Sequence, residues 1–349
     1  MNILHLYTDL NITCGISKTI FNIINGSKNE INHYVVCYGG NRVKNFSDNQ
    51  ISIKIIERRK FLPITFFTIL KICKINRIDI VHSHHRIFDL FAFYLKLFLD
   101  IKTVTSVQSK VYGKKRLSYK ADYLIAVSDT IRKHLINYFA KDDKKIFLIN
   151  NFVSQKEFEF DGKSANFNDG DNSKTICFIG RFSKEKGVDI LLKAFSEIKE
   201  RINSVKLLLV GTGELLEEMT KYIQTNKLNV EIFSPQLNIV SFYKSADIIV
   251  LPSRVDPFPL TMVEAGLMKI PFVGSNVDGI AEFIEHGVNG SLCLPENVAD
   301  LIDILMDNLT DYQNAQLRAE KLYQKVIVDF TEEKIIPKYI SLYKFIHEN

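Results

Sequence analysis

Short apolar runs alternate with longer stretches of helical spacing along this chain of 349 residues. The runs are rich in β-branched and aromatic residues and have the length of buried strands. In the first half they cover residues 2–8, 33–39, 78–84, 102–108, 122–128 and 145–151. Alternation of this kind is typical of an α/β fold, in which a parallel sheet is covered by helices on both faces.

A second alternation follows in the other half of the chain. Its strands are predicted at 175–180, 205–211, 230–234, 247–253, 271–275 and 291–294, with helices at 187–202, 214–226 and 239–245 and from residues 260 and 279. Between the halves, residues 161–174 (DGKSANFNDGDNSK) have the composition of a linker. We therefore expect two Rossmann-like, doubly wound domains at 1–160 and 174–330, joined by a linker at 161–173 and followed by a helical segment at 331–349.

Charge is distributed unevenly between the two halves. Residues 1–160 hold 25 Lys and Arg against 13 Asp and Glu, a net +12, whereas the remainder holds 20 against 27, a net −7. The basic half could face nucleic acid, an anionic membrane surface or a phosphorylated substrate. Its densest cluster is KVYGKKRLSYK, which includes Lys114, Lys115 and Arg116, and it is either a solvated loop or part of a binding cleft.

Neither a membrane span nor a secretion signal is predicted. Residues 86–101 are apolar but are interrupted by Asp89 and Lys96, which predicts a buried or half-buried helix. The first residues, MNILHLYTDL, lack a basic region before an apolar run and predict a first buried strand. The five cysteines have neither paired nor metal-ligand spacing, which favours reduced thiols and a cytoplasmic location.

Ligands of doubly wound sheets bind beyond the carboxyl ends of the strands, so the loops there are the candidate sites. GRFSKEKG, residues 180–187, places Arg181 and Lys186 between a strand and a helix. A guanidinium, an ammonium and a helix N-terminus together suit a pyrophosphate. Solvated surface cations are the alternative for this loop.

Two further loops have the same setting. VGTGELLEE, from residue 210, follows a strand but lacks the third glycine of a dinucleotide fingerprint, so we expect Gly211 to permit a tight turn near a nucleotide or to cap the helix. SRVDPFPLTMVEAG, residues 253–266, places Asp256 before a helix and Glu264 inside it. Two carboxylates at one sheet edge suit sugar hydroxyls, whereas the alternative is a helix cap and a surface residue.

Several of these motifs, in this order, carry a resemblance. GRFSKEKG, VGTGEL, SFYKSADIIVLPS, DPFPLTMVEAG and DGIAEFIEHGVNGSL resemble the nucleotide-sugar-binding domain of retaining glycosyltransferases of the GT-B fold, specifically glycosyltransferase family 4. The resemblance is strong over residues 174–300 and covers the first half in outline. It implies a GT-B architecture whose C-terminal helix returns to the N-terminal domain.

The resemblance also implies a role for each matching residue. Arg181 and Lys186 match the pair that grips the donor diphosphate, and Glu264 matches the acid that binds the ribose. Asp256 stands where the family has a glutamate that touches the transferred sugar, and Gln108 stands where many members have a histidine. Both departures leave the identity of the sugar open.

Other positions are carried over in the same way. The residues implied to face the donor are Gly15, Gly180, Gly211, Ile232, Phe233, Ser234, Phe258, Pro259 and Leu260. The residues expected on the acceptor side are His82, His84, Lys114, Lys115 and Arg116. Ser128 and Asn151 fit recurring positions of the N-terminal domain.

The function implied is retaining transfer of a hexosyl unit, most readily from a UDP-sugar, to a saccharide or lipid-linked saccharide of a bacterial O-antigen, capsule or exopolysaccharide. We expect peripheral contact with the inner face of the membrane, no nucleic-acid partner and no cofactor. We also expect no metal, since Asp169–Asp171 lies in the linker and not after a strand, and His82–His85 has no evident fourth ligand. The alternatives are a sugar-nucleotide epimerase or phosphorylase, an NAD-dependent oxidoreductase and a non-catalytic nucleotide-sugar binder.

Overall fold

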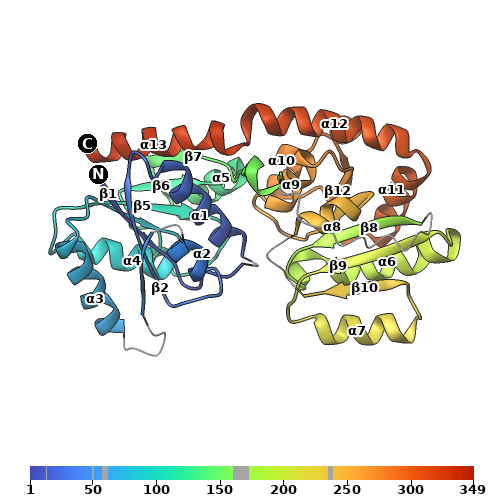
Figure 1. The fold of residues 1–349 in the computed structure, drawn as a ribbon, viewed down its shortest axis with the longest axis horizontal. Helices are drawn as coiled ribbons and strands as arrows, with labels where there is room; N and C mark the ends of the chain where they lie inside the picture. Colours follow the sequence, from blue (N-terminus) through green and yellow to red (C-terminus); the bar gives the residue numbers. More distant parts are fainter. Residues whose placement is uncertain (13, 49–50, 57–61, 160–172, 235–238) are drawn as a thin grey trace. The chain divides into compact units, whose positions relative to one another are not determined.

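The computed structural model describes residues 1–349 except 13, 49–50, 57–61, 160–172 and 235–238 (Figure 1). The chain divides into two compact units. Unit 1 comprises Met1–Asn151 together with Glu332–Asn349, and unit 2 comprises Phe152–Thr331. The linker predicted at 161–173 and the motif Asp169–Asp171 fall almost entirely outside the described residues.

Unit 1 is built on a parallel sheet of seven strands in the order β3-β2-β1-β4-β5-β6-β7. The strands are β1 (Asn2–Leu6), β2 (Asn32–Cys37), β3 (Ser52–Ile55), β4 (Ile80–Ser83), β5 (Lys102–Val107), β6 (Tyr123–Ala126) and β7 (Ile146–Leu148). The helices are α1 (Gly15–Ser27), α2 (Val43–Asp48), α3 (Leu62–Ile75), α4 (Arg86–Leu95), α5 (Asp129–Asn137) and the C-terminal α13 (Glu332–Glu348).

Unit 2 repeats this plan with six parallel strands in the order β10-β9-β8-β11-β12-β13. The strands are β8 (Lys174–Ile179), β9 (Val205–Val210), β10 (Val230–Phe233), β11 (Ile248–Leu251), β12 (Phe272–Ser275) and β13 (Ser291–Cys293). The helices are α6 (Val188–Arg201), α7 (Leu216–Thr225), α8 (Val240–Ser245), α9 (Leu260–Leu267), α10 (Asp278–Phe283), α11 (Val298–Thr310) and α12 (Tyr312–Asp329).

The predicted α/β class with two Rossmann-like sheets is confirmed, as is the return of the C-terminal helix: α13 packs against α1 and β4 of unit 1. The pattern of apolar runs did not predict one strand. Ser52–Ile55 forms β3 at the edge of the sheet, where three of its four side chains are exposed, and its sequence SIKI alternates polar and apolar residues with no continuous apolar run. No helix among the described residues combines the length and apolar character needed to span a bilayer.

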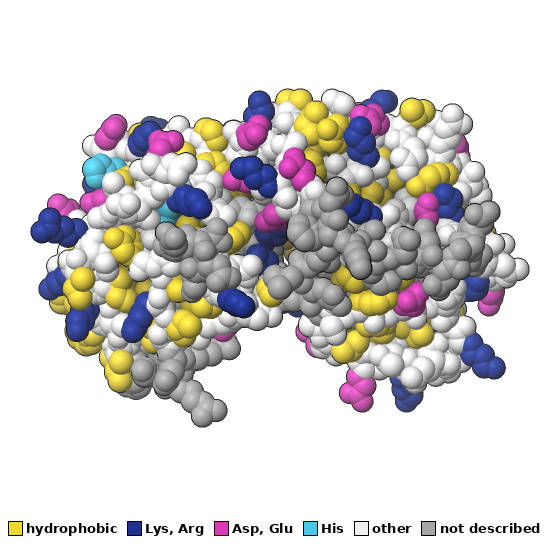
Figure 2. All heavy atoms as spheres, viewed as in Figure 1, with side chains coloured by type: hydrophobic (Ala, Val, Ile, Leu, Met, Phe, Trp, Pro, Cys, Tyr) yellow, Lys and Arg dark blue, Asp and Glu magenta, His cyan; other side chains and the backbone are white. Residues whose placement is uncertain are grey.

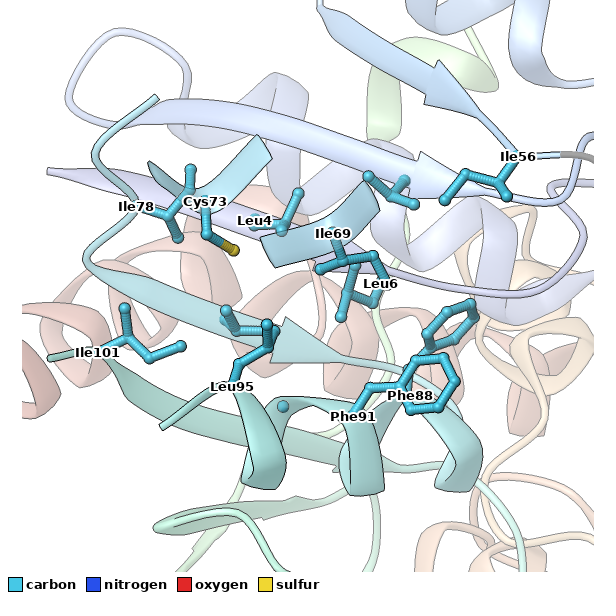
Figure 3. Close-up of a cluster of buried hydrophobic side chains, with 13 residues drawn as sticks. Leu4, Leu6, Ile56, Ile69, Cys73, Ile78, Phe88, Phe91, Leu95 and Ile101 are labelled. Atoms are coloured by element: carbon cyan, nitrogen blue, oxygen red, sulfur yellow. The ribbon is translucent and has the colours of Figure 1, made fainter. Parts of the chain in front are cut away.

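One hydrophobic core cluster of unit 1 lies between its sheet and helices α3 and α4 (Figure 3), and a second involves α1 and α2. Leu4 and Leu6 of β1 contribute from the sheet, while Ile69 and Cys73 of α3 and Phe88, Phe91 and Leu95 of α4 contribute from the helices. These side chains recur every three or four residues along each helix, so one face of the helix is buried. The opposite faces are left toward solvent.

A chain of buried histidines crosses the same sheet. The hydroxyl of Ser27 donates to the carbonyl of Ile23 at 2.5 Å, so its oxygen accepts from Nε2 of His33 at 2.8 Å. His33 Nδ1 then accepts from His5 Nε2 at 3.0 Å, and His5 Nδ1 accepts from His84 Nε2 at 3.1 Å. Because a neutral imidazole has one donor and one acceptor, this order fixes every tautomer in the chain.

His82 on β4 anchors the C-terminal helix to this sheet. Its ring nitrogens lie 2.7 Å from the hydroxyl of Tyr343 on α13 and 2.8 Å from Oγ of Ser106 on β5. The His82 side chain is fully buried, and so is Tyr343. A polar link between a strand and a helix 261 residues later thus lies inside an apolar core.

These histidines make the stability of unit 1 sensitive to acid. Burial lowers the pKa of His33 to about 4 and that of His84 to about 3, and it lowers the pKa of His5 and His82 as well. Between pH 6.5 and those values the unfolded chain binds protons that the folded chain does not. The free energy of unfolding should therefore fall by about 1.4 kcal/mol per histidine for each pH unit below about 6.5.

Urea denaturation of the full chain near pH 7 and near pH 5.5 measures this loss of stability. His33→Gln removes one titrating ring and should reduce the loss. Equal stability of the wild type at the two pH values contradicts the assignment of neutral buried rings.

Candidate glycosyl-donor site

The loops that follow β8 and β11 lie side by side at one edge of the sheet of unit 2. The two strands are paired in parallel, with Ile248 beside Ile176 and Ile249 beside Cys177. Their carboxyl ends therefore open onto the same edge, and each loop leads into a helix. Arg181 and Lys186 come from the first loop and Asp256 from the second.

Lys186 and Asp256 form the central contact of this edge. Lys186 Nζ lies 2.6 Å from Asp256 Oδ2, and the hydroxyl of Ser253 donates to the same oxygen at 3.3 Å. The backbone amide of Asp256 donates to Oδ2 of Asp278 at 3.2 Å. The Asp256 side chain is only 4% exposed, whereas that of Lys186 is 24% exposed, so the ammonium lies at the boundary between the protein and solvent.

Arg181 lies in the same loop but makes a different contact. Its side chain is 62% exposed, and its guanidinium donates a hydrogen bond to Glu185 at 2.6 Å. An exposed pair of this kind contributes little to stability, so the guanidinium can exchange Glu185 for another anion at small cost. Each of the two predicted cations thus has a carboxylate partner of its own in this structure.

Arg254, which the sequence analysis did not single out, ties the two loops together. Its guanidinium forms two 2.9 Å hydrogen bonds to Asp189 at the start of α6 and one of 2.8 Å to Glu296, and its backbone amide donates to the carbonyl of Glu185. Burial opposes the ionisation of Asp189, but the hydrogen bonds and the charge of Arg254, together with hydrogen bonds from backbone amides at the start of α6, outweigh burial and hold the pKa of that carboxyl below its usual value. Arg254 thereby holds the turn that carries Lys186 beside the turn that carries Asp256.

Glycines allow the loops to approach backbone to backbone. Gly187 has a φ of +70°, and a Cβ there would lie 1.9 Å from the carbonyl oxygen of Pro252. A Cβ on Gly211 would lie 1.9 Å from the carbonyl oxygen of Gly180. Any larger residue at either position would push the loops after β8, β9 and β11 apart.

Helix α9 presents its N-terminus at this edge. Pro259 precedes the helix and has no side-chain acceptor, and Leu260 begins it, so the first amides of α9 are not capped by the preceding side chain. Thr261 donates to the carbonyl of Ile179 at 3.1 Å, which fixes the helix start against the end of β8. The Phe258 side chain is buried and packs on Phe283 and Phe330, so only its backbone can face a ligand.

Glu264 lies one turn further along α9 and is 3% exposed. Its Oε2 accepts a 2.5 Å hydrogen bond from the hydroxyl of Tyr243 on α8. Burial raises the pKa of Tyr243 well above its usual value, and the nearby Glu264 carboxylate raises it further, so the phenol remains a donor. The structure therefore holds the Glu264 carboxylate in a defined orientation.

The predicted base-binding segment lies at the end of β10, the edge strand of the sheet. Ile232 and Phe233 are half-buried there, and Ser234 is exposed. Phe233 packs against Phe242 of α8, with ring centroids 5.1 Å apart. These residues are three strands away from β11 in the order of the sheet.

Unit 1 presents a corresponding edge after β1, β4 and β5. Gly15 begins α1 and is exposed, while Gln108 directly follows β5. Nε2 of Gln108 is buried without a hydrogen-bond partner among the described residues. Ser128 caps α5 by accepting from the amide of Ile131 at 3.3 Å, and Asn151 accepts from Thr19, so both have structural contacts.

The acceptor-side predictions divide into two groups. His82 and His84, which we expected on the acceptor side, are buried, and the hydrogen bonds of His82 to Ser106 and Tyr343 place its ring in the core of unit 1. Lys114, Lys115 and Arg116 are exposed, and Lys115 Nζ lies 4.0 Å from the centre of the Tyr138 ring. The sequence could not separate these groups, because burial of a histidine depends on the strand and helix packed against it.

His5, His82 and His84 also have ring nitrogens within 4.8 Å of one another, as metal ligands do. Both nitrogens of His5 and both of His82 already take part in hydrogen bonds, so a bound ion would have to break several of these. The arrangement fits a hydrogen-bonded chain of neutral rings better than a metal site.

Two family models together match most of this chain. The model of glycosyl transferases group 1 matches residues 159–325, and that of glycosyltransferase family 4 matches residues 14–157. The protein therefore belongs to the family 4 glycosyltransferases of GT-B fold and is a transferase.

Relatives and solved structures agree with this assignment. The chain is 27% identical over 289 residues to N-acetyl-alpha-D-glucosaminyl L-malate synthase of Bacillus anthracis, covering 77% of this chain and 75% of the relative. It is 24% identical, over 99% of both chains, to an uncharacterized 41.2 kDa protein in the cps region of Klebsiella pneumoniae. The fold superposes on Anabaena HepE, solved with UDP and glucose, with a TM-score of 0.88 at 17% identity, covering 98% of this chain and 99% of that chain.

Removal of the Tyr243 hydroxyl tests the geometry around Glu264. Tyr243→Phe removes one hydrogen-bond donor from a buried carboxylate, and we expect the free energy of unfolding to fall by about 1–3 kcal/mol. Tyr222→Phe on α7, where the side chain is half-buried, is the matched control and should change stability little. Equal urea midpoints for the two variants contradict the role assigned to the Tyr243–Glu264 hydrogen bond.

Proposed function

We propose that this glycosyltransferase moves a hexosyl unit from a nucleotide sugar, most readily a UDP-sugar, with retention of configuration at the anomeric carbon. The observation that carries this proposal is the meeting of Lys186 and Asp256 at the edge where α9 begins, with Arg181 in the same loop. In the proposed complex with the donor, the diphosphate is bound by Lys186, Arg181 and the N-terminus of α9. Asp256 then faces the sugar, and Glu264 faces the ribose.

The proposed chemistry needs charge stabilisation more than a protein nucleophile. As the bond between the anomeric carbon and the phosphate oxygen lengthens, negative charge grows on the departing diphosphate. Lys186 and Arg181 stabilise that charge more strongly in the transition state than in the bound donor, and this difference lowers the barrier. The departing phosphate oxygen takes the proton of the acceptor hydroxyl, whose oxygen forms the new bond to the anomeric carbon.

Since these two cations and a helix N-terminus supply the positive charge, the proposal includes neither a metal nor a cofactor.

Asp256 has a second role in the proposed reaction. The Asp256 carboxylate holds the Lys186 ammonium in place before the donor binds. When a phosphate of the donor replaces Asp256 as the partner of Lys186, the carboxylate becomes available to accept a hydrogen bond from a sugar hydroxyl. This exchange accounts for a buried acid beside a phosphate-binding cation.

We further propose that the acceptor is a saccharide or lipid-linked saccharide of a bacterial surface polysaccharide and that unit 1 binds it. The position of the Klebsiella relative in a cps region supports the pathway, and the net +12 of residues 1–160 supports an anionic acceptor or membrane surface. Lys114, Lys115 and Arg116 are the exposed cations proposed to face the acceptor. Contact with the inner face of the membrane would be peripheral.

A panel of UDP-, GDP- and ADP-sugars tests the donor part of the proposal. We expect hydrolysis or transfer with at least one UDP-sugar and a product whose anomeric configuration, determined by NMR, matches that of the donor. Tight nucleotide-sugar binding without turnover of any donor would instead support a binding protein. An inverted product would contradict retention.

Substitution of the cations tests their part in the site. Lys186→Met and Arg181→Met should each lower kcat/KM by about 10²-fold or more, because each removes charge that the transition state requires. Arg181 is exposed, so its variant keeps the test valid if loss of Lys186 disturbs folding. Glu185→Gln is the matched control: it frees Arg181 and retains both cations, and it should keep or raise donor affinity. Wild-type kinetics in both methionine variants contradict the assignment.

A further inference from the structure

Large apolar side chains are concentrated on one part of the surface of unit 1. Half of the large exposed apolar residues that the structure describes lie between residues 55 and 98. Phe67 on α3 is 61% exposed, and Leu97 and Phe98, which follow α4, are 71% and 56% exposed. Soluble surfaces normally scatter such residues singly, and a concentration of them marks an interaction site.

The residues form a connected surface. Phe66 is partly buried against the core, and its ring lies 5.7 Å from that of Phe67 and 6.0 Å from that of Phe98. Ile64 precedes Phe67 by three residues, so it lies on the same face of α3. We call Ile64, Phe67, Leu97 and Phe98 the α3–α4 apolar face.

Two exposed lysines flank this apolar face on α3. Lys71 and Lys74 are exposed and follow Phe67 by four and seven residues, which continues the same stripe of α3. The described residues between 51 and 102 contain seven Lys and Arg against three Asp and Glu. Figure 2 shows yellow and dark blue side chains interspersed over the part of unit 1 where Figure 1 labels α3 and α4.

We propose that the α3–α4 apolar face enters an anionic lipid bilayer, with Ile64, Phe67, Leu97 and Phe98 among the acyl chains and Lys71 and Lys74 at the phosphate headgroups. Apolar side chains flanked by lysines are the composition of a surface that lies in the plane of a membrane. A symmetric contact between two copies would bring like-charged lysines together, which argues against a second copy as the occupant. The inference rests on the proposed peripheral membrane contact and assigns it to particular residues.

The absence of tryptophan from the sequence makes a direct reporter possible. Phe67→Trp and Phe98→Trp each introduce a single indole into the face, and Leu317→Trp places one at a comparably exposed position on α12. With vesicles of equal parts phosphatidylglycerol and phosphatidylcholine, the emission of the first two variants should shift to the blue and that of Leu317→Trp should not. No shift in any variant, or the same shift in all three, overturns the proposal.

Vesicle sedimentation separates the apolar contribution to membrane binding from the electrostatic contribution. Phe67→Ser with Leu97→Ser, and separately Lys71→Glu with Lys74→Glu, should each lower the partition coefficient about tenfold or more. The matched pairs Leu317→Ser with Val328→Ser and Lys193→Glu with Lys221→Glu, all in unit 2, should not lower it. Added salt should weaken binding of the wild type and have little effect on the variant that lacks the two lysines.

Two other outcomes are distinguishable. If the face joins two copies, sedimentation velocity will show a dimer that Phe67→Ser with Leu97→Ser dissociates, while vesicle binding stays low; this overturns the proposal. Vesicle binding is measured without donor or acceptor, so its failure leaves the transfer chemistry untouched. Conversely, loss of donor turnover in the Lys186 variant leaves vesicle binding unchanged.

Discussion

The contact between Lys186 and Asp256 is the interaction on which the account of the site depends. A carboxylate that is 4% exposed has lost most of its hydration, and the ammonium at 2.6 Å together with the Ser253 hydroxyl replaces it. The Lys186 side chain is one quarter exposed, so its ammonium can still meet an anion from solvent. Asp256 therefore holds the Lys186 ammonium in position where the carboxyl ends of β8 and β11 meet the start of α9.

Three features around this pair hold two loops from different strands close together. The parallel pairing of β8 and β11 brings the loops to one edge, and Gly187 lets their backbones touch. Arg254 then fixes the distance by bonding to the start of α6 and to the neighbouring turn. A shift of about 1 Å in either loop would separate a cation from its partner, which is why the glycine and the arginine matter as much as the acid and the lysine.

Sequence patterns were sufficient for the architecture, because strands buried on both faces are apolar without interruption and helices bury one stripe. They failed at β3, where an edge strand of four residues is exposed. They located Lys186 and Asp256, since both follow predicted strands, but they missed Arg254 and Tyr243. The partners of those two, Asp189 and Glu264, lie 65 and 21 residues away, and no local spacing indicates which residues pack together. For the same reason a histidine motif near a strand end gave no indication that His82 would bond to a tyrosine of the last helix.

The exchange of Asp256 for a phosphate as the partner of Lys186 is open to a direct measurement. The account predicts that a crystal structure with the nucleoside diphosphate that binds most tightly will place a phosphate oxygen within about 3 Å of Lys186 Nζ, next to the first amides of α9. Arg181 should then have left Glu185 for the same diphosphate. A diphosphate bound elsewhere, with the Lys186–Asp256 contact unchanged, would contradict the account.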